Sequence, residues 1–481
     1  MKPAFQIFLA LSAPAQILQS RIDSVLADSP FARRAHWGLV VVDFSANKPV
    51  YSHNPDHLFV PASNTKLFST ALALTRLGPD HRFVTRLHPS GPISQEGVLQ
   101  GSLLFTGGGD PTLSGRPIPY QRGIASDPLG PLQQLVDSAW RAGLRRITGD
   151  IIGDDRHYIH EPYSTGWSID DTVYEYGAPV SALILHDNFL RLHLRAGSDP
   201  GEPVVALFQP PIPYFSLDAR VTTSSRPQTI SVDRPLGSRH ILVSGNLKPD
   251  AAVAQELAVD DPARYAAFAL RHLLVERGIR VDGAIGALHR SLRHPPPAEP
   301  LGVEIARRTS PPLLEILKTV NKVSQNLHAE IVLREVARIH GNQPSRQAGL
   351  SQLIRFLASI GIDGSTYRFQ DASGLSRLTL VSPTAIVTLL RHMYQSSDRD
   401  AWIDLLPISA HDGSLYLRFR DVKSGRVMAK TGTLSHTGAL SGYIENSQGR
   451  VLAFSMLVNN ANATGADIRE FIDKVVTLLV E

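Results

Sequence analysis

The hexapeptide Pro61-Ala62-Ser63-Asn64-Thr65-Lys66 precedes an apolar segment with helical spacing, Leu67 to Leu74. Because Ser63 and Lys66 are three residues apart, a helix would place both side chains on one face. A serine hydroxyl is a weak nucleophile until a neighbouring base takes its proton, and Lys66 could act as that base. The pattern therefore predicts Ser63 at a helix N-terminus, where free backbone N–H groups favour developing negative charge.

Two further motifs lie where the sequence predicts a loop and a strand. The first, Ser324-Gln325-Asn326, falls in a polar break between two helical patterns, and the second is Lys430-Thr431-Gly432-Thr433. Taken singly, the first could merely cap a helix and the second could be an exposed strand end. The ordered set Ser-x-x-Lys, Ser-x-Asn and Lys-Thr-Gly instead predicts one site with a serine nucleophile.

The first two motifs supply the groups for proton transfer. Ser63 would attack a carbonyl carbon and form an acyl ester, while Lys66 accepts the hydroxyl proton. Ser324 would relay that proton to the leaving amine. Asn326 is expected to bind either Lys66 or the substrate amide.

The third motif supplies charge and substrate contacts. Lys430 would help to keep Lys66 neutral and would attract an anionic ligand. The hydroxyls of Thr431 and Thr433 are predicted to bind a terminal carboxylate, and Gly432 leaves room for a substrate backbone along the strand edge. The backbone N–H groups of Ser63 and Thr433 are the expected oxyanion hole.

Composition excludes several other kinds of protein. The chain has 481 residues, 43% hydrophobic and 19% charged, with a net charge of +4, as in an ordinary globular protein of two to three domains. Its basic residues occur in short pairs, which argues against a nucleic-acid partner but leaves peripheral association with an anionic membrane or wall open. It has no cysteine, and its 18 histidines show no local metal-ligand motif, so neither a metal nor a cofactor is expected.

The chain also carries signals of export and of domain organisation. Residues 1–15 resemble a signal peptide, the alternative being an ordinary first helix, and no other segment has the ~20 apolar residues of a membrane span. Strands are expected at 37–43 and 48–53, and again in a C-terminal meander at 426–458 followed by a helix. An antiparallel sheet built from both chain ends and flanked by helices fits this order. Between the N-terminal strands and the C-terminal meander, residues 83–290 are predicted to be mainly β, with one helix at 132–142. A linker is predicted after them, at 294–297.

These motifs resemble the class C, low-molecular-mass penicillin-binding proteins, which are D-alanyl-D-alanine carboxypeptidases and endopeptidases of the penicillin-binding-protein-4 type. The likeness covers nearly the whole chain and includes 61–68, 107–113, 371–377, 412–415 and 430–434. It implies an α+β fold: a penicillin-recognising, β-lactamase-like domain with a two-domain, mainly β insertion. The catalytic domain would comprise 16–82 and 291–481, inserted domain II 83–107 and 180–290, and inserted domain III 108–179.

The resemblance also implies the substrate, the stem peptide and cross-links of peptidoglycan, with β-lactams as acylating inhibitors and the periplasm as location. Asp154 or Asp155 would bind the free ammonium of the stem, or would be ordinary surface carboxylates. Arg377 would line the cleft or pair with Asp371. Gln325 replaces the more usual Asp or Asn of the family, which bears on fine specificity.

Two alternatives remain open from the sequence. A related enzyme that deacylates quickly would be a β-lactamase. A protein that kept the fold without activity would bind or organise the wall. The balance between carboxypeptidase and endopeptidase activity and the oligomeric state are not encoded in any motif.

Overall fold

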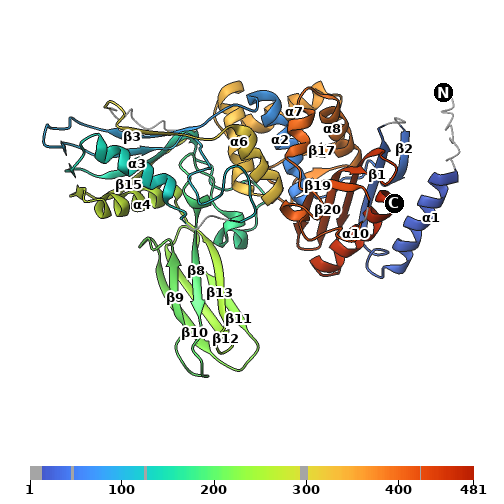
Figure 1. Cartoon of the computed structure of the whole chain (residues 1–481), viewed down its shortest axis with the longest axis horizontal. Coiled ribbons are helices and arrows are strands. Elements are labelled where there is room, and N and C mark those ends of the chain that lie inside the picture. The colour runs from blue at the N-terminus through green and yellow to red at the C-terminus, as the bar shows by residue number, and fades with distance from the viewer. Residues whose placement is uncertain (1–12, 45–47, 124–126, 293–301, 423) are drawn as a thin grey trace.

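The computed structural model describes residues 13–44, 48–123, 127–292, 302–422 and 424–481. It shows an elongated molecule with two lobes, in which the first described helix and the C-terminal helix lie in the same lobe (Figure 1). The predicted signal peptide falls almost wholly on residues outside the described ranges, as does the predicted linker at 294–297. Among the described residues, no helix is long and apolar enough to span a bilayer.

The first lobe is built on a five-stranded antiparallel sheet made from both chain ends, as predicted. Its order is β19-β20-β21-β1-β2. The strands β1 and β21 are apolar along most of their length because helices cover both faces of the sheet. The bounds are β1 His36–Asp43, β2 Lys48–His53, β19 Arg426–Leu434, β20 Thr437–Glu445 and β21 Val451–Asn459.

Helices pack on the two faces of this sheet and form two separate apolar cores. On one face lie α1 (Ala13–Asp28) and α10 (Gly465–Val480), which confirms the expected N- and C-terminal helices. The other core contains α2 and the helices that follow the insertion. The bounds are α2 Thr65–Leu77, α5 Leu313–Lys318, α6 Asn326–His340, α7 Arg346–Ser359, α8 Pro383–Gln395 and α9 Arg399–Asp404, with the short strands β17 Tyr367–Arg368 and β18 Leu380–Val381.

The second lobe is the insertion between α2 and α5. Its larger sheet has five strands in the order β15-β7-β5-β3-β16, and a second sheet has three strands in the order β14-β6-β4. Helices α3 and α4 contribute to the apolar core of this lobe. The bounds are β3 Val84–Pro89, β4 Val98–Leu99, β5 Leu103–Thr106, α3 Gly130–Arg141, β6 Arg146–Ile147, β7 Ile151–Ile159, α4 Pro262–Glu276, β14 Arg280–Val281, β15 Ile285–Arg290 and β16 Ala306–Thr309.

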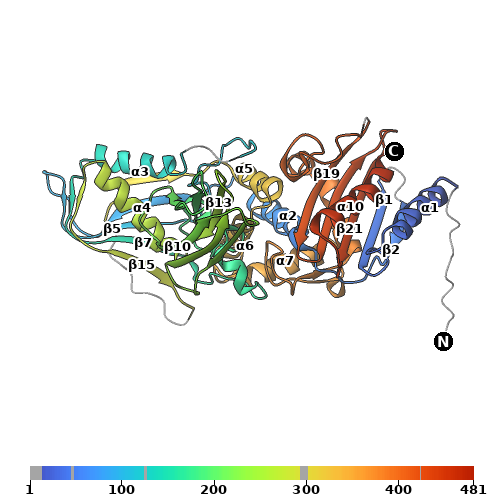
Figure 2. The same cartoon turned by 90° about the horizontal axis from the view of Figure 1, so that it is seen from below.

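A β arm projects from this lobe (Figure 1). It consists of two three-stranded sheets, β13-β8-β9 and β10-β12-β11, around a small apolar core. Figure 2 shows the same arm viewed nearly along its length, between the two lobes. The bounds are β8 Phe189–Arg195, β9 Val205–Gln209, β10 Ser216–Thr223, β11 Thr229–Asp233, β12 His240–Leu247 and β13 Ala252–Ala258.

The insertion contains one long helix that the sequence analysis did not predict. Helix α4 begins after Asp261, whose carboxylate accepts a hydrogen bond from the Arg264 N–H, and Pro262 occupies its first turn. Its alanine and leucine face is fully buried against the inserted sheet. The start signals were present in the sequence, but the surrounding β-type runs masked them.

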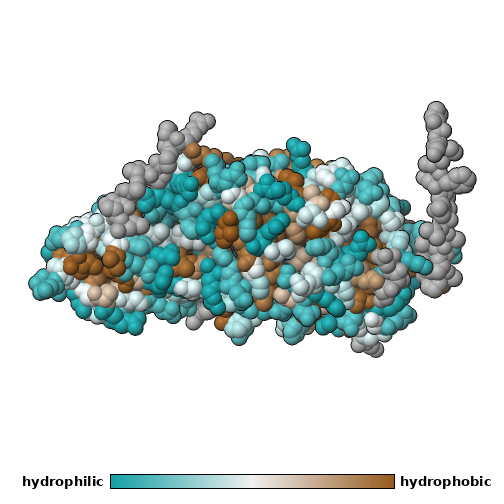
Figure 3. Space-filling view, turned by 90° about the horizontal axis from the view of Figure 1, so that it is seen from above, coloured by the Kyte–Doolittle hydropathy of each residue, from teal (hydrophilic) through white to brown (hydrophobic). Residues whose placement is uncertain are grey.

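Hydrophobic residues are scattered over the face of the molecule that is seen from above. There, hydrophobic residues form small separate groups among hydrophilic ones (Figure 3). Such scattered groups are usual for a water-exposed surface and need no partner to cover them.

Candidate active site

Ser63 lies in a tight turn immediately before α2. The turn is a single 3-10 element, Ala62–Asn64, and Ala62 has a φ of 47°, in the left-handed region that favours glycine. Two contacts hold this strained turn: Thr65 Oγ1 donates to the Ala62 carbonyl at 2.9 Å, and Asn64 Nδ2 donates to Ser441 Oγ at 2.7 Å. The second contact ties the turn to β20 of the central sheet.

Lys66 connects the nucleophile to two distant parts of the chain. A hydrogen bond of 2.9 Å joins its Nζ to Ser63 Oγ, and others reach Asn326 Oδ1 at 2.6 Å and the Ser373 carbonyl at 2.7 Å. The side chain is fully buried. Burial lowers the pKa of Lys66 to about 7, although the carboxylates of Asp371 and Glu330 oppose the shift. A large share of Lys66 is therefore neutral near pH 7 and able to accept a proton.

Ser324 and Asn326 lie at the junction between a π-helical turn, Thr319–Val323, and α6. Ser324 has a φ of 71°, and Gln325 caps α6 by accepting a hydrogen bond from the Leu327 N–H at 2.7 Å. Gln325 thus supports its own helix N-terminus. Asn326 Nδ2 donates to the Tyr176 carbonyl at 2.7 Å, so a residue of the insertion contacts the site directly.

Lys430 joins the second motif to the third. Its Nζ donates to Ser324 Oγ at 2.9 Å and to the Thr431 carbonyl at 2.8 Å. Burial, followed by the charge of Lys66, lowers the pKa of Lys430 well below its usual value. The charge of Lys66 thus opposes protonation of Lys430, whereas the predicted effect of Lys430 on Lys66 stays a prediction.

The strand that carries Lys430 is an edge strand, since β19 ends the sheet. Thr433 is exposed on it, and Thr431 Oγ1 is hydrogen-bonded to Ser414 Oγ at 2.7 Å. A Cβ at Gly432 would come within 2.9 Å of the Pro61 carbonyl oxygen and 3.1 Å of Ala62 Cβ. Glycine is thus required here because β19 packs directly against the turn that holds Ser63.

A buried carboxylate pair positions the segment that contains the Ser373 carbonyl, and sequence reasoning gave Glu330 no role and Asp371 only a pairing with Arg377. Glu330 on α6 accepts hydrogen bonds from the N–H groups of Ala372 and Ser373 at 2.9 and 3.1 Å. Asp371 accepts from the Ser376 N–H at 2.8 Å, among other donors. The only sequence signal for this arrangement was the segment 371–377 itself.

Arg377 is the last residue of this segment, and it does not form the predicted pair with Asp371. Its guanidinium donates to the Ser435 carbonyl at 3.3 Å, beyond the end of β19, whereas Asp371 is occupied by Trp167, Ser376 and Thr379. Arg377 therefore lies beside the motif strand and does not hold Asp371.

Asp154 and Asp155 lie on β7 in the insertion, and both carboxylates are already engaged. Asp154 is 3% exposed and accepts from the Arg156 guanidinium at 2.8 Å. Asp155 is 2% exposed and contacts Ser181, His289 and His160. An incoming ammonium would have to replace one of these partners, so the ammonium-binding role stays a prediction.

A separate ion-pair cluster links the insertion to α6. Asp187 is buried in a turn before β8, where its carboxylate accepts from His328 Nε2 at 2.8 Å and from Arg116 Nε at 2.6 Å. His328 lies two residues after Asn326 on α6. Asp187 thus fixes the start of α6 relative to the insertion.

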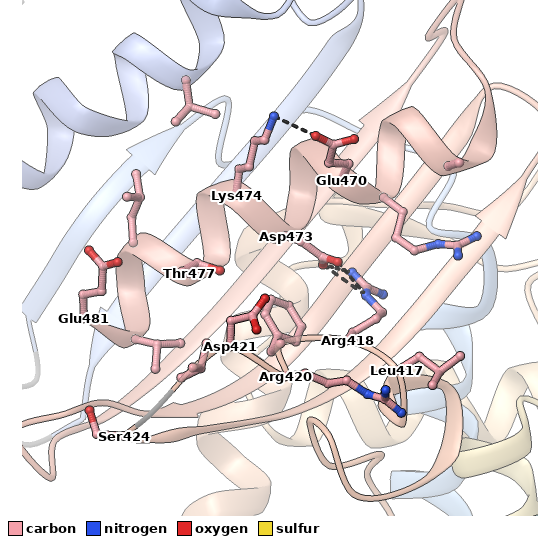
Figure 4. A pocket seen from close by; sticks show the side chains of 17 residues that line it. Leu417, Arg418, Arg420, Asp421, Ser424, Glu470, Asp473, Lys474, Thr477 and Glu481 are labelled. Carbon is pink, nitrogen blue, oxygen red and sulfur yellow. Dashed lines mark hydrogen bonds and ion pairs between the residues drawn. The ribbon is translucent and has the colours of Figure 1, made fainter.

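A large cavity lies elsewhere, between α10 and the loop that precedes β19 (Figure 4). It measures about 1060 Å³, and its charged lining is largely paired internally, as in Arg418 with Asp473 and Lys474 with Glu470. It includes no residue of the three motifs. Its size does not make it the reaction site, because it offers no activated nucleophile.

Comparisons with known proteins agree with this geometry. The model of the D-Ala-D-Ala carboxypeptidase 3 (S13) family matches residues 18–479. A D-alanyl-D-alanine carboxypeptidase from an Actinomadura species is 33% identical over 466 residues, which cover 94% of this chain and 82% of that protein. Penicillin binding protein 4 from Haemophilus influenzae has the same fold, with a TM-score of 0.80 and 24% identity over 96% of this chain and 99% of that chain. A second structure of that protein, complexed with a β-lactam, gives a TM-score of 0.75 at the same identity and coverage.

Proposed function

Since the chain belongs to the D-Ala-D-Ala carboxypeptidase 3 (S13) family, we propose that it is a serine D,D-peptidase that acts through an acyl-enzyme on Ser63. The observation that carries this mechanism is the pair of hydrogen bonds from Lys66 Nζ to Ser63 Oγ and Asn326 Oδ1. They join a nucleophile, a buried base and a positioning amide from two separate motifs. A serine hydroxyl needs such an adjacent base to attack a carbonyl at neutral pH.

In the acylation step, Ser63 Oγ attacks the carbonyl carbon of the penultimate D-alanine while Lys66 takes the hydroxyl proton. The tetrahedral oxyanion is held by the N–H groups of Ser63 and Thr433, a contact worth roughly 3 to 4 kcal/mol per donor. The C–N bond then breaks, and the leaving amine receives a proton through Ser324, which Lys430 holds by a 2.9 Å hydrogen bond.

In the second step, water attacks the ester carbonyl, the C–Oγ bond breaks, and the proton returns to Ser63. The groups that assisted acylation act in reverse order, so Lys66 again accepts and then returns a proton. The enzyme ends in its starting state, and no cofactor is consumed.

The terminal carboxylate of the substrate would bind at the edge strand β19. Thr433 is exposed there, Thr431 is held by Ser414, and the buried Lys430 amine lies on the same strand. A peptide backbone can lie along such an edge and pair with its free N–H and C=O groups. This recognition suits both a stem peptide and the fused ring of a β-lactam.

We propose peptidoglycan stem peptides ending in D-alanyl-D-alanine, and the cross-links between stems, as the substrates. Arg377 is the exposed cation next to β19, which supports a contact with the anionic part of a stem. Asp154 or Asp155 remains the predicted contact for the stem ammonium. Such a substrate places the enzyme outside the cytoplasm, and we propose the periplasm.

Digestion of purified, cross-linked muropeptides followed by mass spectrometry tests the proposal directly. Loss of one D-alanine from monomers reports carboxypeptidase activity, and conversion of dimers to monomers reports endopeptidase activity. Ser63→Ala should abolish both. If the Ser63→Ala protein digested as fast as the wild type, the proposed mechanism would be wrong.

Penicillin distinguishes the alternatives that the sequence left open. A long-lived adduct on Ser63 supports a D,D-peptidase, whereas rapid turnover of penicillin would indicate a β-lactamase. A protein that neither acylates nor digests muropeptides would be a wall-binding protein that keeps only the fold.

A further inference from the structure

Three side chains that could ligate a metal converge within the inserted sheet. Asp155 lies on β7, His160 follows the end of β7, and His289 lies on the neighbouring parallel strand β15. The strands β7 and β15 run side by side in this lobe (Figure 2). The pairing shifts register between Leu288 and Arg290, so His289 occupies the irregular position.

The distances between these groups fit a small, compact site. His289 Nδ1 is 2.9 Å from Asp155 Oδ1, and His160 Nδ1 is 3.6 Å from Asp155 Oδ2. One ligand atom from each side chain lies within 4.8 Å of the other two, and the imidazole ring centroids are 4.2 Å apart. Around tetrahedral zinc, ligand atoms lie roughly 3.3–3.5 Å from each other, because each is about 2.0–2.2 Å from the ion.

A surrounding set of contacts would orient the ligands. Asp261 Oδ2 lies 3.5 Å from His289 Nε2, the ring nitrogen that faces away from Asp155. Asp261 is itself fixed as the cap of α4, by a 3.0 Å hydrogen bond from the Arg264 N–H. Ser181 Oγ donates to Asp155 Oδ2 at 2.9 Å. Carboxylates that accept from the second nitrogen of a ligating histidine are typical of zinc sites.

Exposure also fits an ion that keeps one open position. The Asp155 side chain is 2% exposed, while those of His160 and His289 are 33% and 29% exposed, so solvent reaches the histidine side of the cluster. Three protein ligands with a solvent-facing fourth position match the N/O chemistry of zinc.

We propose that Asp155, His160 and His289 bind a divalent transition-metal ion of the zinc type, with Asp261 and Ser181 as orienting partners. The ion would join β7, β15 and the segment that carries Ser181. The ion would lie apart from the three sequence motifs, which contribute no ligand to it. The sequence analysis expected no metal because it searched for ligands close together in the chain, and these come from separate strands.

The competing explanation is that a proton occupies this cluster. Burial opposes protonation, but the carboxylates of Asp155 and Asp261 raise the pKa of His289 to about 10. A histidinium would then satisfy both carboxylates without any ion. Direct measurement of metal binding separates the two explanations.

The test uses the full chain, treated with chelator and dialysed, and titrated with zinc sulfate by isothermal titration calorimetry. We expect one equivalent of Zn²⁺ to bind, with binding lost in His160→Ala and His289→Ala. Asp261→Asn should weaken binding about 10- to 100-fold. His193→Ala is the matched control, because His193 is half-buried on β8, lies outside the proposed ligand set, and has a hydrogen bond of 3.0 Å to the Gln209 side chain.

Cobalt provides a second readout that does not depend on activity. Co²⁺ bound by this set should give the visible absorption of a four-coordinate site, and the two histidine variants should not. Each variant's fold is checked by its far-UV circular dichroism and its acylation by a fluorescent penicillin. Failure of the wild type to bind zinc, or equal binding by wild type and folded His160→Ala or His289→Ala, would overturn the proposal.

Discussion

Lys66 Nζ and Asn326 Oδ1 lie 2.6 Å apart although 260 positions separate the two residues in the chain. The whole inserted lobe lies between them in sequence. Asn326 Nδ2 in turn contacts the Tyr176 carbonyl of that lobe. Lys66, the proposed base, therefore contacts an asparagine that the inserted lobe also holds.

Replacing Lys66 by methionine should remove the base while keeping a buried, unbranched side chain. We expect the rate of acylation by a fluorescent penicillin to fall about 10²- to 10⁴-fold, the usual contribution of a positioned base. The rate is measured by stopped-flow fluorescence. An unchanged rate in a folded Lys66→Met protein would exclude Lys66 as the base.

Acylation should rise with pH through a limb near pH 7. Burial lowers the pKa of Lys66 to about 7, so below that pH the side chain is an ammonium that cannot accept a proton, and above it the base is free. The pH profile of kcat/KM with a small ester or β-lactam measures this limb. Arg377→Ala should leave the limb in place, because Arg377 has no contact with Lys66. A limb near the ordinary lysine pKa would contradict the assignment.

Gly432→Ala should slow acylation more than it destabilises the protein. The added methyl would press on the Pro61 carbonyl and Ala62, and so displace the turn that holds Ser63. The control is Gly286→Ala on β15, where the nearest atom to a new Cβ is Ile152 Cγ1 at 3.7 Å. Acylation kinetics and urea unfolding of both variants separate the two effects. Equal kinetics for the two variants would show that the close approach of β19 is unimportant.

Asp187→Ala should destabilise the protein by about 3 to 5 kcal/mol, because it leaves Arg116 and His328 without their buried partner. Burial opposes ionisation of this carboxyl, but Arg116 and then His328 hold its pKa well below the usual range. The ionised carboxylate therefore stabilises the fold above about pH 4, and this contribution is lost as the pH falls below that value. Urea unfolding of wild type and variant at pH 7 and pH 3 measures the difference, which should shrink at the lower pH.

Arg377→Ala should raise KM for stem peptides and leave acylation by small β-lactams nearly unchanged. The reason is that Arg377 lies beyond the end of β19 and has no contact with Ser63 or Lys66. Steady-state kinetics with a stem peptide and with penicillin separate these effects. A fall in kcat for both substrates would instead indicate a role in the catalytic geometry.

Asn variants of the two β7 aspartates test the predicted ammonium contact. If Asp154 or Asp155 binds the stem ammonium, its replacement should raise KM for a stem with a free amine and not for an N-acetylated stem. Equal changes for both stems would exclude an ammonium contact by that residue.

Local pattern was enough to predict much of the catalytic lobe. The strands at 37–43 and 48–53 and the C-terminal meander have continuous apolar runs with clear turns, and the structure confirms them. Helix α4 was missed because its Asp-Pro start lies among β-type segments. Glu330 was missed because a glutamate on a helix is ordinarily solvated, and only tertiary packing buries it against the Ser373 N–H.

The contacts of the site residues could not be derived from spacing alone. Asp155 and His289 are 134 positions apart, and their contact depends on the register of two parallel strands. The three catalytic motifs were recognisable only because their order is distinctive. Asp154 and Asp155 are buried by tertiary packing, which no local sequence pattern predicts.

The order β19-β20-β21-β1-β2 has a consequence for the growing chain. The strand that carries Lys430 is completed only after nearly all of the polypeptide has been made, and β21 must be inserted between β20 and the N-terminal hairpin. A chain truncated before β19 therefore holds Ser63 without Lys430, so assembly of the proposed site requires the C-terminal strands as well as the N-terminal turn.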